Sequence, residues 1–246
     1  MQFRQLLSNP WARFASLYLA TALTLCGGQQ PAASPAGTQI DVDELLSECQ
    51  RPVRGKSHAG MVWWIPPEFW EASGGTQDPA AKALVDSLRQ YTVVAVVVGK
   101  VSPLGTISWI PTSDLRSKSA LRDQRGNEYR PLENISAEAQ LISSVIRPIL
   151  SNAIGKMGEN LELLFFPAKG KNGEAIADPR KKGSFSIVLL EIAGAPENVY
   201  QWQLPLSSVL PPKFCPVGKE SVKANWNYCP WHGVPLDTSE PRAPNP

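Results

Sequence analysis

One stretch of the chain, Thr92 to Val101, constrains the fold more than any other, because it is a continuous run rich in valine. β-Branched residues favour extended backbone, and an unbroken apolar run of this kind is typical of a strand that is buried on both faces. Such a strand lies inside a sheet and needs packed layers on both sides. The run therefore predicts a sheet-based globular domain, which a chain of 246 residues is long enough to build.

Further strand signals surround this run. Apolar stretches bounded by proline or turn residues predict strands at residues 61–65, 106–110, 119–123, 128–132, 161–166, 185–189 and 200–204. The chain also contains 23 prolines, and the usual share of proline is only about 5%. A high proline content suits a fold with many turns. Together the patterns predict a mainly β domain of about seven or eight strands.

Two helical insertions interrupt the strands. Asp78 is a natural N-cap and Pro79 a natural first residue for one helix. The second helix begins near Ser136, contains Pro148, which must kink or split it, and stops at Gly155. Its apolar residues predict a wide buried stripe: Leu141, Ile142, Val145, Ile146, Ile149, Leu150, Ala153 and Ile154.

The segment from Leu121 to Leu132 has a strand–turn–strand pattern, with Gln-Arg-Gly-Asn at its turn. It resembles a phrase that is common in the immunoglobulin-like domains of bacterial envelope proteins. The resemblance covers residues 60–212 and implies an immunoglobulin-like β-sandwich, from which the helical segment at 136–155 departs. A fold of this kind says little about function.

The first 25 residues have the pattern of a secretory signal peptide. Arg4 and Arg13 precede an apolar run from Phe14 to Leu25. The run is shorter than the roughly 20 residues that a membrane span needs, which favours cleavage. Lysine and arginine outnumber aspartate and glutamate by 24 to 22, and the two extra cations belong to this segment. The chain after this segment has no net charge, so its overall charge does not indicate nucleic-acid binding.

Two cleavage sites compete. Ala20-Thr21-Ala22 fits the small-x-small pattern of ordinary signal cleavage. Leu23-Thr24-Leu25-Cys26 resembles the bacterial lipobox, although Leu25 departs from the small residue that is usual there. The lipobox resemblance implies that Cys26 is lipidated, and Gly27 in place of aspartate then implies the outer membrane. The uncleaved anchor and the simple secreted or periplasmic protein stay open as alternatives.

The rest of the chain divides by composition. Residues 26–59 are rich in small and polar residues and predict a tether and linker, with a helical turn or two at 41–58. Residues 60–212 form the expected β-sandwich domain. Residues 213–236 contain two similar cysteine segments and differ from the strand patterns before them, which predicts a separate small module. Residues 237–246 predict a disordered tail.

The module carries the residues that are best suited to specific chemistry. Two similar phrases, Phe214-Cys215-Pro-Val-Gly218 and Tyr228-Cys229-Pro-Trp-His232, begin 14 residues apart. They resemble the two knuckles of a zinc ribbon, in which each knuckle gives two ligands to one tetrahedral Zn²⁺. The resemblance implies Cys215, Cys229 and His232 as ligands. Gly218 stands where a fourth cysteine is usual, so we expect Cys49, or less favourably His58, to complete the site.

A disulfide between Cys215 and Cys229 is the competing interpretation. Exported proteins meet an oxidising environment, and a disulfide across so short a loop would stabilise the module by about 3 kcal/mol. If Cys26 is lipidated, Cys49 is left without a partner, which favours metal. If Cys26 is not lipidated, a Cys26–Cys49 disulfide is also open. Zinc, a disulfide and free thiols therefore remain as alternatives.

No other pattern indicates an active site. The chain has two histidines, and it lacks a phosphate-binding glycine loop, a nucleophile elbow and a His-Glu-x-x-His helix. Trp63, Trp64 and Trp70 gather near Pro66-Pro67 and form either core packing or an aromatic platform for sugar or peptide. The densest basic stretch, at residues 169–182, is read as a solvated hairpin tip rather than a patch for anionic surfaces.

The sequence therefore predicts an exported, lipid-anchored bacterial envelope protein without enzymatic activity. Its partners would be the membrane, through the anchor, and an envelope protein or polysaccharide. The alternative is a zinc-dependent hydrolase or another metal-handling periplasmic protein, in which Cys215, Cys229 and His232 leave one coordination position open for water.

Overall fold

The computed structural model describes residues 40–236, except 54, 56, 74–78, 193 and 195. The signal peptide, Cys26, the expected N-cap Asp78 and the tail at 237–246 lie outside these residues. Among the described residues, strand content exceeds helix content, and every strand pair is antiparallel. The prediction of a mainly β protein is therefore confirmed. Within the same residues, no helix combines the length and the apolar character that crossing a membrane requires.

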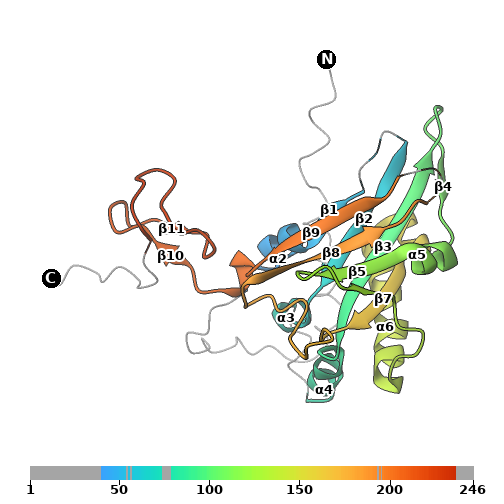
Figure 1. Cartoon of the computed structure of the whole chain (residues 1–246), viewed down its shortest axis with the longest axis horizontal. Coiled ribbons are helices and arrows are strands. Elements are labelled where there is room, and N and C mark those ends of the chain that lie inside the picture. The colour runs from blue at the N-terminus through green and yellow to red at the C-terminus, as the bar shows by residue number, and fades with distance from the viewer. Residues whose placement is uncertain are drawn as a thin grey trace, which may run out of the picture.

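The valine-rich run is the central strand of the larger sheet (Figure 1). That sheet contains β1 (Gln50–Pro52), β2 (His58–Ile65), β3 (Tyr91–Val101), β4 (Ile107–Trp109) and β7 (Glu162–Pro167). One edge of β3 pairs with β2 along its length, and β7 and β4 share the other edge. Residues 92–98 of β3 are all buried. The expectation of a strand buried on both faces is thus confirmed.

A second sheet packs against the first. It has the order β6 (Glu128–Tyr129), β5 (Ser119–Asp123), β8 (Gly183–Leu189) and β9 (Asn198–Leu204). Trp64 of β2 meets Phe185 of β8 edge-on, with 4.9 Å between ring centroids. Phe185 in turn stacks on Trp202 of β9 at 5.1 Å. These three buried rings fill the space between the sheets, where aromatic side chains contribute large buried areas.

Hydrogen bonds join the two sheets at both sides. Beyond β6, the backbone N–H of Leu132 donates to the carbonyl of Phe165 in β7 at 2.7 Å. On the opposite side, Nε of Arg51 in β1 donates to the carbonyl of Gln201 in β9 at 3.2 Å. The two layers are therefore tied together along their edges as well as through their core.

The described residues contain five α-helices beside the sheets, which is more than the two insertions expected. They are α2 (Val42–Cys49), α3 (Pro67–Ala72), α4 (Pro79–Leu88), α5 (Thr112–Lys118) and α6 (Ala137–Ala153), and η1 (Gly155–Asn160) follows the last. The helices α4 and α6 are the two predicted insertions, and α2 lies where a helical turn or two is expected, within residues 41–58. Pro148 lies inside α6, which continues to Ala153 without being split.

The apolar stripe of α6 is narrower than predicted. Ile142 and Leu150 are buried, and Ile142 and Ile146 line a small apolar cavity with β-strand residues of the first sheet. Leu141, Val145 and Ile149 are instead exposed by 54%, 56% and 43%. The expectation that the whole stripe is buried is therefore wrong. Only the helix face with Ile142 and Leu150 packs into the core, and the neighbouring face, which carries the three exposed residues, points away from it.

Part of the expected tether belongs to the folded domain. Asp41 caps α2 by accepting hydrogen bonds from the backbone N–H groups of Asp43 and Glu44. Leu45 and Cys49 of α2 are buried in the core, and β1 pairs with β2. The folded domain therefore begins before residue 60, where the sequence pattern predicts the end of the linker. The apolar residues of this short segment are too few to suggest a core element from sequence.

The same helix positions the C-terminal module. The Glu48 carboxylate accepts hydrogen bonds from the backbone N–H groups of Ser207 and Ser208, at 2.9 and 3.0 Å, in η2 (Ser207–Val209). Ser207 Oγ then accepts from the backbone N–H of Ala224 at 2.8 Å. The module, with β10 (Lys213–Phe214) paired to β11 (Ser221–Val222), extends from one end of the body (Figure 1).

Candidate metal centre

Two turns of the module have the same backbone geometry. In the first, the N–H of Cys215 donates to the carbonyl of Glu220, and the N–H of Lys219 donates back to the carbonyl of Cys215. In the second, the N–H of Cys229 donates to the carbonyl of Val234, and the N–H of Gly233 donates back to the carbonyl of Cys229. The offsets of five and four residues are identical in the two turns.

The repetition extends to the flanking residues. Phe214 pairs with Ser221 around the first turn, and Tyr228 pairs with Pro235 around the second, at equal offsets. Lys219 and Gly233 occupy equivalent positions with φ of 62° and 65°. Gly233 adopts this left-handed conformation at no steric cost, whereas Lys219 is the one described non-glycine residue with positive φ. The chain therefore builds the same knuckle twice.

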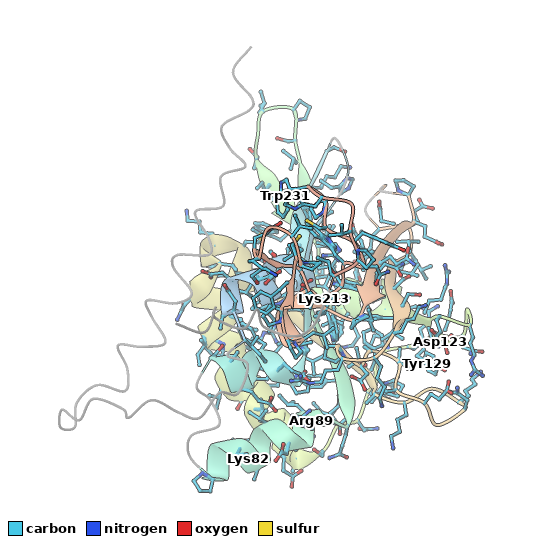
Figure 2. All side chains as sticks on the ribbon, turned by 90° about the vertical axis from the view of Figure 1, so that its left-hand side faces the viewer. Lys82, Arg89, Asp123, Tyr129, Lys213 and Trp231 are labelled. Atoms are coloured by element: carbon cyan, nitrogen blue, oxygen red, sulfur yellow. The ribbon has the colours of Figure 1, made fainter. Side chains whose placement is uncertain are left out.

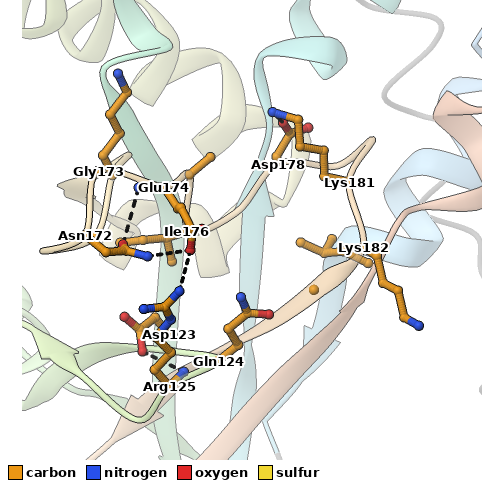
Figure 3. Close-up of a pocket in the computed structure, with 15 residues that line it drawn as sticks. Asp123, Gln124, Arg125, Asn172, Gly173, Glu174, Ile176, Asp178, Lys181 and Lys182 are labelled. Atoms are coloured by element: carbon orange, nitrogen blue, oxygen red, sulfur yellow. Dashed lines mark hydrogen bonds and ion pairs between the residues drawn. The ribbon is translucent and has the colours of Figure 1, made fainter.

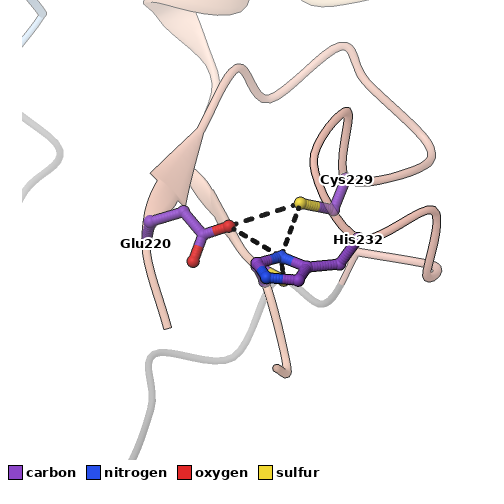
Figure 4. Close-up of side chains that lie close together, drawn as sticks. Glu220, Cys229 and His232 are labelled. Atoms are coloured by element: carbon purple, nitrogen blue, oxygen red, sulfur yellow. Dashed lines mark hydrogen bonds and ion pairs between the residues drawn. The ribbon is translucent and has the colours of Figure 1, made fainter. Parts of the chain in front are cut away.

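The two knuckles bring four potential ligands together (Figure 4). Cys215, Glu220, Cys229 and His232 each present one donor atom, and these atoms all lie within 4.8 Å of one another. Nδ1 of His232 lies 3.4 Å from each cysteine Sγ. Oε1 of Glu220 lies 3.3 Å from Cys229 Sγ and 3.3 Å from the same Nδ1.

These separations match the edges of a coordination tetrahedron. Zinc lies about 2.3 Å from thiolate sulfur and about 2.0–2.2 Å from imidazole nitrogen or carboxylate oxygen. For tetrahedral angles, those bond lengths give donor–donor edges of roughly 3.3–3.8 Å. The four separations given above, of 3.3–3.4 Å, fall at the short end of this range. The cluster can therefore close around one ion with small adjustments of the side chains.

The local electrostatics suit a cation. The pKa of Glu220 is lowered, first by the hydrogen bond from its own backbone N–H and less by the two thiols and His232. Burial raises the pKa of the Cys229 thiol, while the backbone N–H groups of His232 and Trp231 act in the opposite direction by hydrogen-bonding the sulfur. The N–H of Gly218 likewise donates to Cys215 Sγ at 3.4 Å. Amides that point at sulfur stabilise thiolate, which is the form that ligates metals.

The structure brings together three of the four predicted ligands and replaces the fourth. Cys215 and Cys229 are buried free thiols beside His232. Cys49 is also a free thiol, but it lies in the main core, where its carbonyl accepts a hydrogen bond from Nε1 of Trp202 at 3.1 Å. His58, the weaker candidate, begins β2. Neither belongs to the metal cluster, and the expectation that Cys49 completes the site is wrong.

Sequence reasoning missed Glu220. The zinc-ribbon pattern directs attention to the third residue after Cys215, which is Gly218, and not to the fifth. Glu220 lies five residues after Cys215, and in the folded knuckle the hydrogen bond between these two residues holds it beside the cysteine, just before β11. A carboxylate at that offset is the feature that could have indicated a fourth ligand.

The other candidate regions show ordinary structural roles. Trp63 and Trp64 are buried in the core and Trp70 packs against it, so the tryptophans form core packing rather than a platform. The basic hairpin at residues 169–182 borders an open cavity of about 500 Å³ (Figure 3). Its neighbourhood pairs opposite charges, with Arg125 on Glu174 at 2.9 Å and Lys181 on Asp178 at 3.2 Å. This pairing agrees with a solvated loop.

Comparison of the chain with protein-family models, with curated proteins and with solved structures finds no match in any of the three. The function of the protein is therefore inferred from its sequence and from the geometry of the site.

Proposed function

We propose that this protein is a non-enzymatic binding protein whose C-terminal module is held together by one structural zinc ion. The observation that carries the proposal is the convergence of Cys215, Glu220, Cys229 and His232 from two equivalent knuckles. Two sulfurs, one imidazole nitrogen and one carboxylate oxygen form a ligand set that suits Zn²⁺ in tetrahedral geometry. The ion would supply the stability that such a small module cannot obtain from apolar burial.

A structural role fits this ligand set better than a catalytic one. Catalytic zinc sites keep one position open for water or substrate, and structural sites are closed by four protein ligands. Glu220 fills the position that the hydrolase alternative needs to be open. Among the described residues, the cluster contains no further carboxylate or histidine that could act as a general base.

The proposal extends to fold and location. Two antiparallel sheets packed face to face support an immunoglobulin-like sandwich, and the duplicated knuckle supports a zinc-ribbon-like module. The signal-peptide pattern and the lipobox-like sequence support export and a lipid anchor on Cys26. In the envelope, the protein would bind another envelope component through surfaces of the sandwich or the module.

Metal content and intact mass, measured on protein purified from the envelope without chelator or reductant, test the proposal. We expect one zinc per chain, free thiols, and a lipid-modified chain that begins at Cys26. The His232→Ala variant should lose the zinc, and His58→Asn should keep it. A metal-free chain that is two hydrogens lighter, with the bond assigned to Cys215 and Cys229 by peptide mapping, would contradict the zinc site and establish the disulfide instead.

A further inference from the structure

A cavity of about 400 Å³ lies between the body and the module. Its lining comes from both parts: Asp41 and Glu44 at the start of α2 belong to the body, and Lys223, Trp226 and Trp231 belong to the module. The metal cluster contributes no ligand to this lining, so the cavity is distinct from the metal centre. The Ser207–Ala224 hydrogen bond ties its two sides together.

The module side of the cavity is aromatic. The rings of Trp226 and Trp231 lie 6.5 Å apart between centroids and are inclined at 60°. Trp231 is 68% exposed. Figure 2, which views the molecule from the end that carries the module, shows its position there. Large exposed tryptophans are uncommon on protein surfaces and are enriched where ligands or partners bind. Two inclined rings offer π-faces to one bound group.

The body side of the cavity is acidic. Asp41 and Glu44 contribute two carboxylates, and Lys223 is the one cation in the lining. The Lys223–Glu44 separation is 3.9 Å, at the outer limit of an ion pair. Glu48, one turn beyond Glu44, adds a further negative charge behind this wall. The cavity therefore combines a net negative charge with aromatic faces.

The available hydrogen-bonding groups argue against a sugar as the occupant. A saccharide needs several free donors and acceptors around its hydroxyls, but the Ser208 hydroxyl already bonds the Glu48 carboxylate at 2.7 Å. Ser207 Oγ accepts from Ala224, and Asp41 caps α2. An organic cation has fewer such needs, because ring faces and carboxylates attract its charge directly.

We propose that this cavity binds an alkylammonium group, with the cation held over Trp226 and Trp231 and its charge balanced by Glu44. Trp231 lies between Cys229 and His232 in the chain, so metal binding at those ligands fixes the backbone that carries the ring. This coupling rests on the proposed zinc site, whereas the ligand chemistry rests on the cavity alone. It would give the structural metal a functional purpose, which is to hold one wall of a binding site.

Titration of the purified full-length mature protein with choline, followed by calorimetry and tryptophan fluorescence, tests the ligand chemistry. The matched probe is the neutral carbon isostere of choline, in which a tert-butyl group replaces the trimethylammonium group. We expect choline to bind and the isostere to bind roughly tenfold more weakly. Equal binding of the two probes, or no choline binding by protein that contains its metal, would overturn the proposal.

Variants locate the site. Trp231→Ala and Glu44→Gln should each weaken choline binding roughly three- to tenfold. Tyr228→Ala is the matched control, because Tyr228 is exposed on the module to a similar extent but does not line the cavity, and it should leave binding unchanged. Lys223→Gln removes the competing cation and should tighten binding. An equal loss in Trp231→Ala and Tyr228→Ala would place the ligand elsewhere and overturn the proposal.

Metal content, measured on the same samples, separates this inference from the zinc proposal. Choline binding by a metal-free, disulfide-bonded protein would refute zinc and leave the cavity assignment standing. Choline binding that falls when metal is removed by chelator, and returns with zinc, would support both.

Discussion

The carboxylate of Glu220 occupies the space into which a side chain at position 218 would project. An ideal Cβ built on Gly218 would lie 1.8 Å from Oε2 of Glu220 and 2.8 Å from Cε1 of His232. Gly218 is the third residue after Cys215, as His232 is the third after Cys229. In the first knuckle, Glu220, which lies just before β11, therefore fills the space that a ligand at position 218 would need.

This relationship predicts that the usual ligand can be restored if the carboxylate is removed at the same time. The double variant Gly218→Cys with Glu220→Ala should bind zinc more tightly than the natural chain, by roughly tenfold or more, because a third thiolate replaces a carboxylate. Glu220→Ala alone should weaken zinc binding, because one ligand is lost. Competition against a chromophoric chelator measures these affinities, and the cobalt(II) spectrum reports the number of thiolate ligands.

The single variant Gly218→Cys is the informative control. Its new side chain clashes with Glu220, so we expect no gain in affinity without the second substitution. If Gly218→Cys alone tightened zinc binding as much as the double variant, the claim that the Glu220 carboxylate blocks a side chain at position 218 would be refuted.

A second prediction concerns Cys49, which is 1% exposed and packs in the main core. Cys49→Ala should leave the zinc affinity unchanged and lower the free energy of unfolding by about 1 kcal/mol, because a small buried group is lost. Burial raises the pKa of this thiol well above its usual value, so it should also react slowly with thiol reagents in the folded protein. Urea unfolding and metal competition on the same sample check the first two expectations, and a thiol-labelling time course checks the third. Loss of zinc in Cys49→Ala would contradict the ligand set.

Sequence patterns predicted the elements whose signal is local. The run at Thr92–Val101 predicted a central strand because β-branched valines favour extended backbone, and the turn at Gln124–Asn127 predicted the β5–β6 hairpin. The knuckle cysteines and His232 were found for the same reason, since each knuckle is a local turn with fixed offsets.

What the sequence could not predict depends on contacts between distant segments. The helix α2 is a core element because Glu48 reaches η2 and because Cys49 meets Trp202, contacts that span more than 150 residues. The fourth ligand depended on which side chain fills the space beside Gly218. The exposed side of α6 could not be recognised either, because periodicity identifies apolar positions but not how wide the contacted face is.

The narrow buried face of α6 gives a prediction from two adjacent residues. Ile142 is 6% exposed and Leu141 is 54% exposed. Ile142→Ala should lower the free energy of unfolding by roughly 2–4 kcal/mol, and Leu141→Ala should change it by less than about 0.5 kcal/mol. Urea denaturation of both variants measures the difference. Similar losses in the two variants would mean that the Leu141 side chain is covered in solution.

The last prediction concerns Glu68, a buried carboxyl group at the start of α3. It lies 3.5 Å from Nε of Arg180, and its Oε2 has no hydrogen-bond partner. Burial raises its pKa above the usual value of 4.5, although its own backbone N–H and Arg180 act in the opposite direction. An ionised carboxylate in this position is therefore a net cost to the folded state.

The raised pKa of Glu68 determines how its contribution to folding stability changes with pH. Because the pKa is higher in the folded chain, the folded state takes up a proton before the unfolded state as pH falls, so protonation of Glu68 favours folding. Glu68→Gln removes the charge at every pH and should raise the melting temperature at pH 7. This advantage should shrink as the pH falls from neutral toward 4.5, the usual value at which the unfolded chain also becomes protonated. Thermal unfolding of the natural chain, Glu68→Gln and the exposed control Glu159→Gln across this range tests the prediction. A destabilised Glu68→Gln at pH 7 would show that the Arg180 ion pair outweighs the cost of burying the carboxylate. An advantage that does not change with pH would show that the gain does not come from the ionisation of Glu68, and would also contradict the prediction.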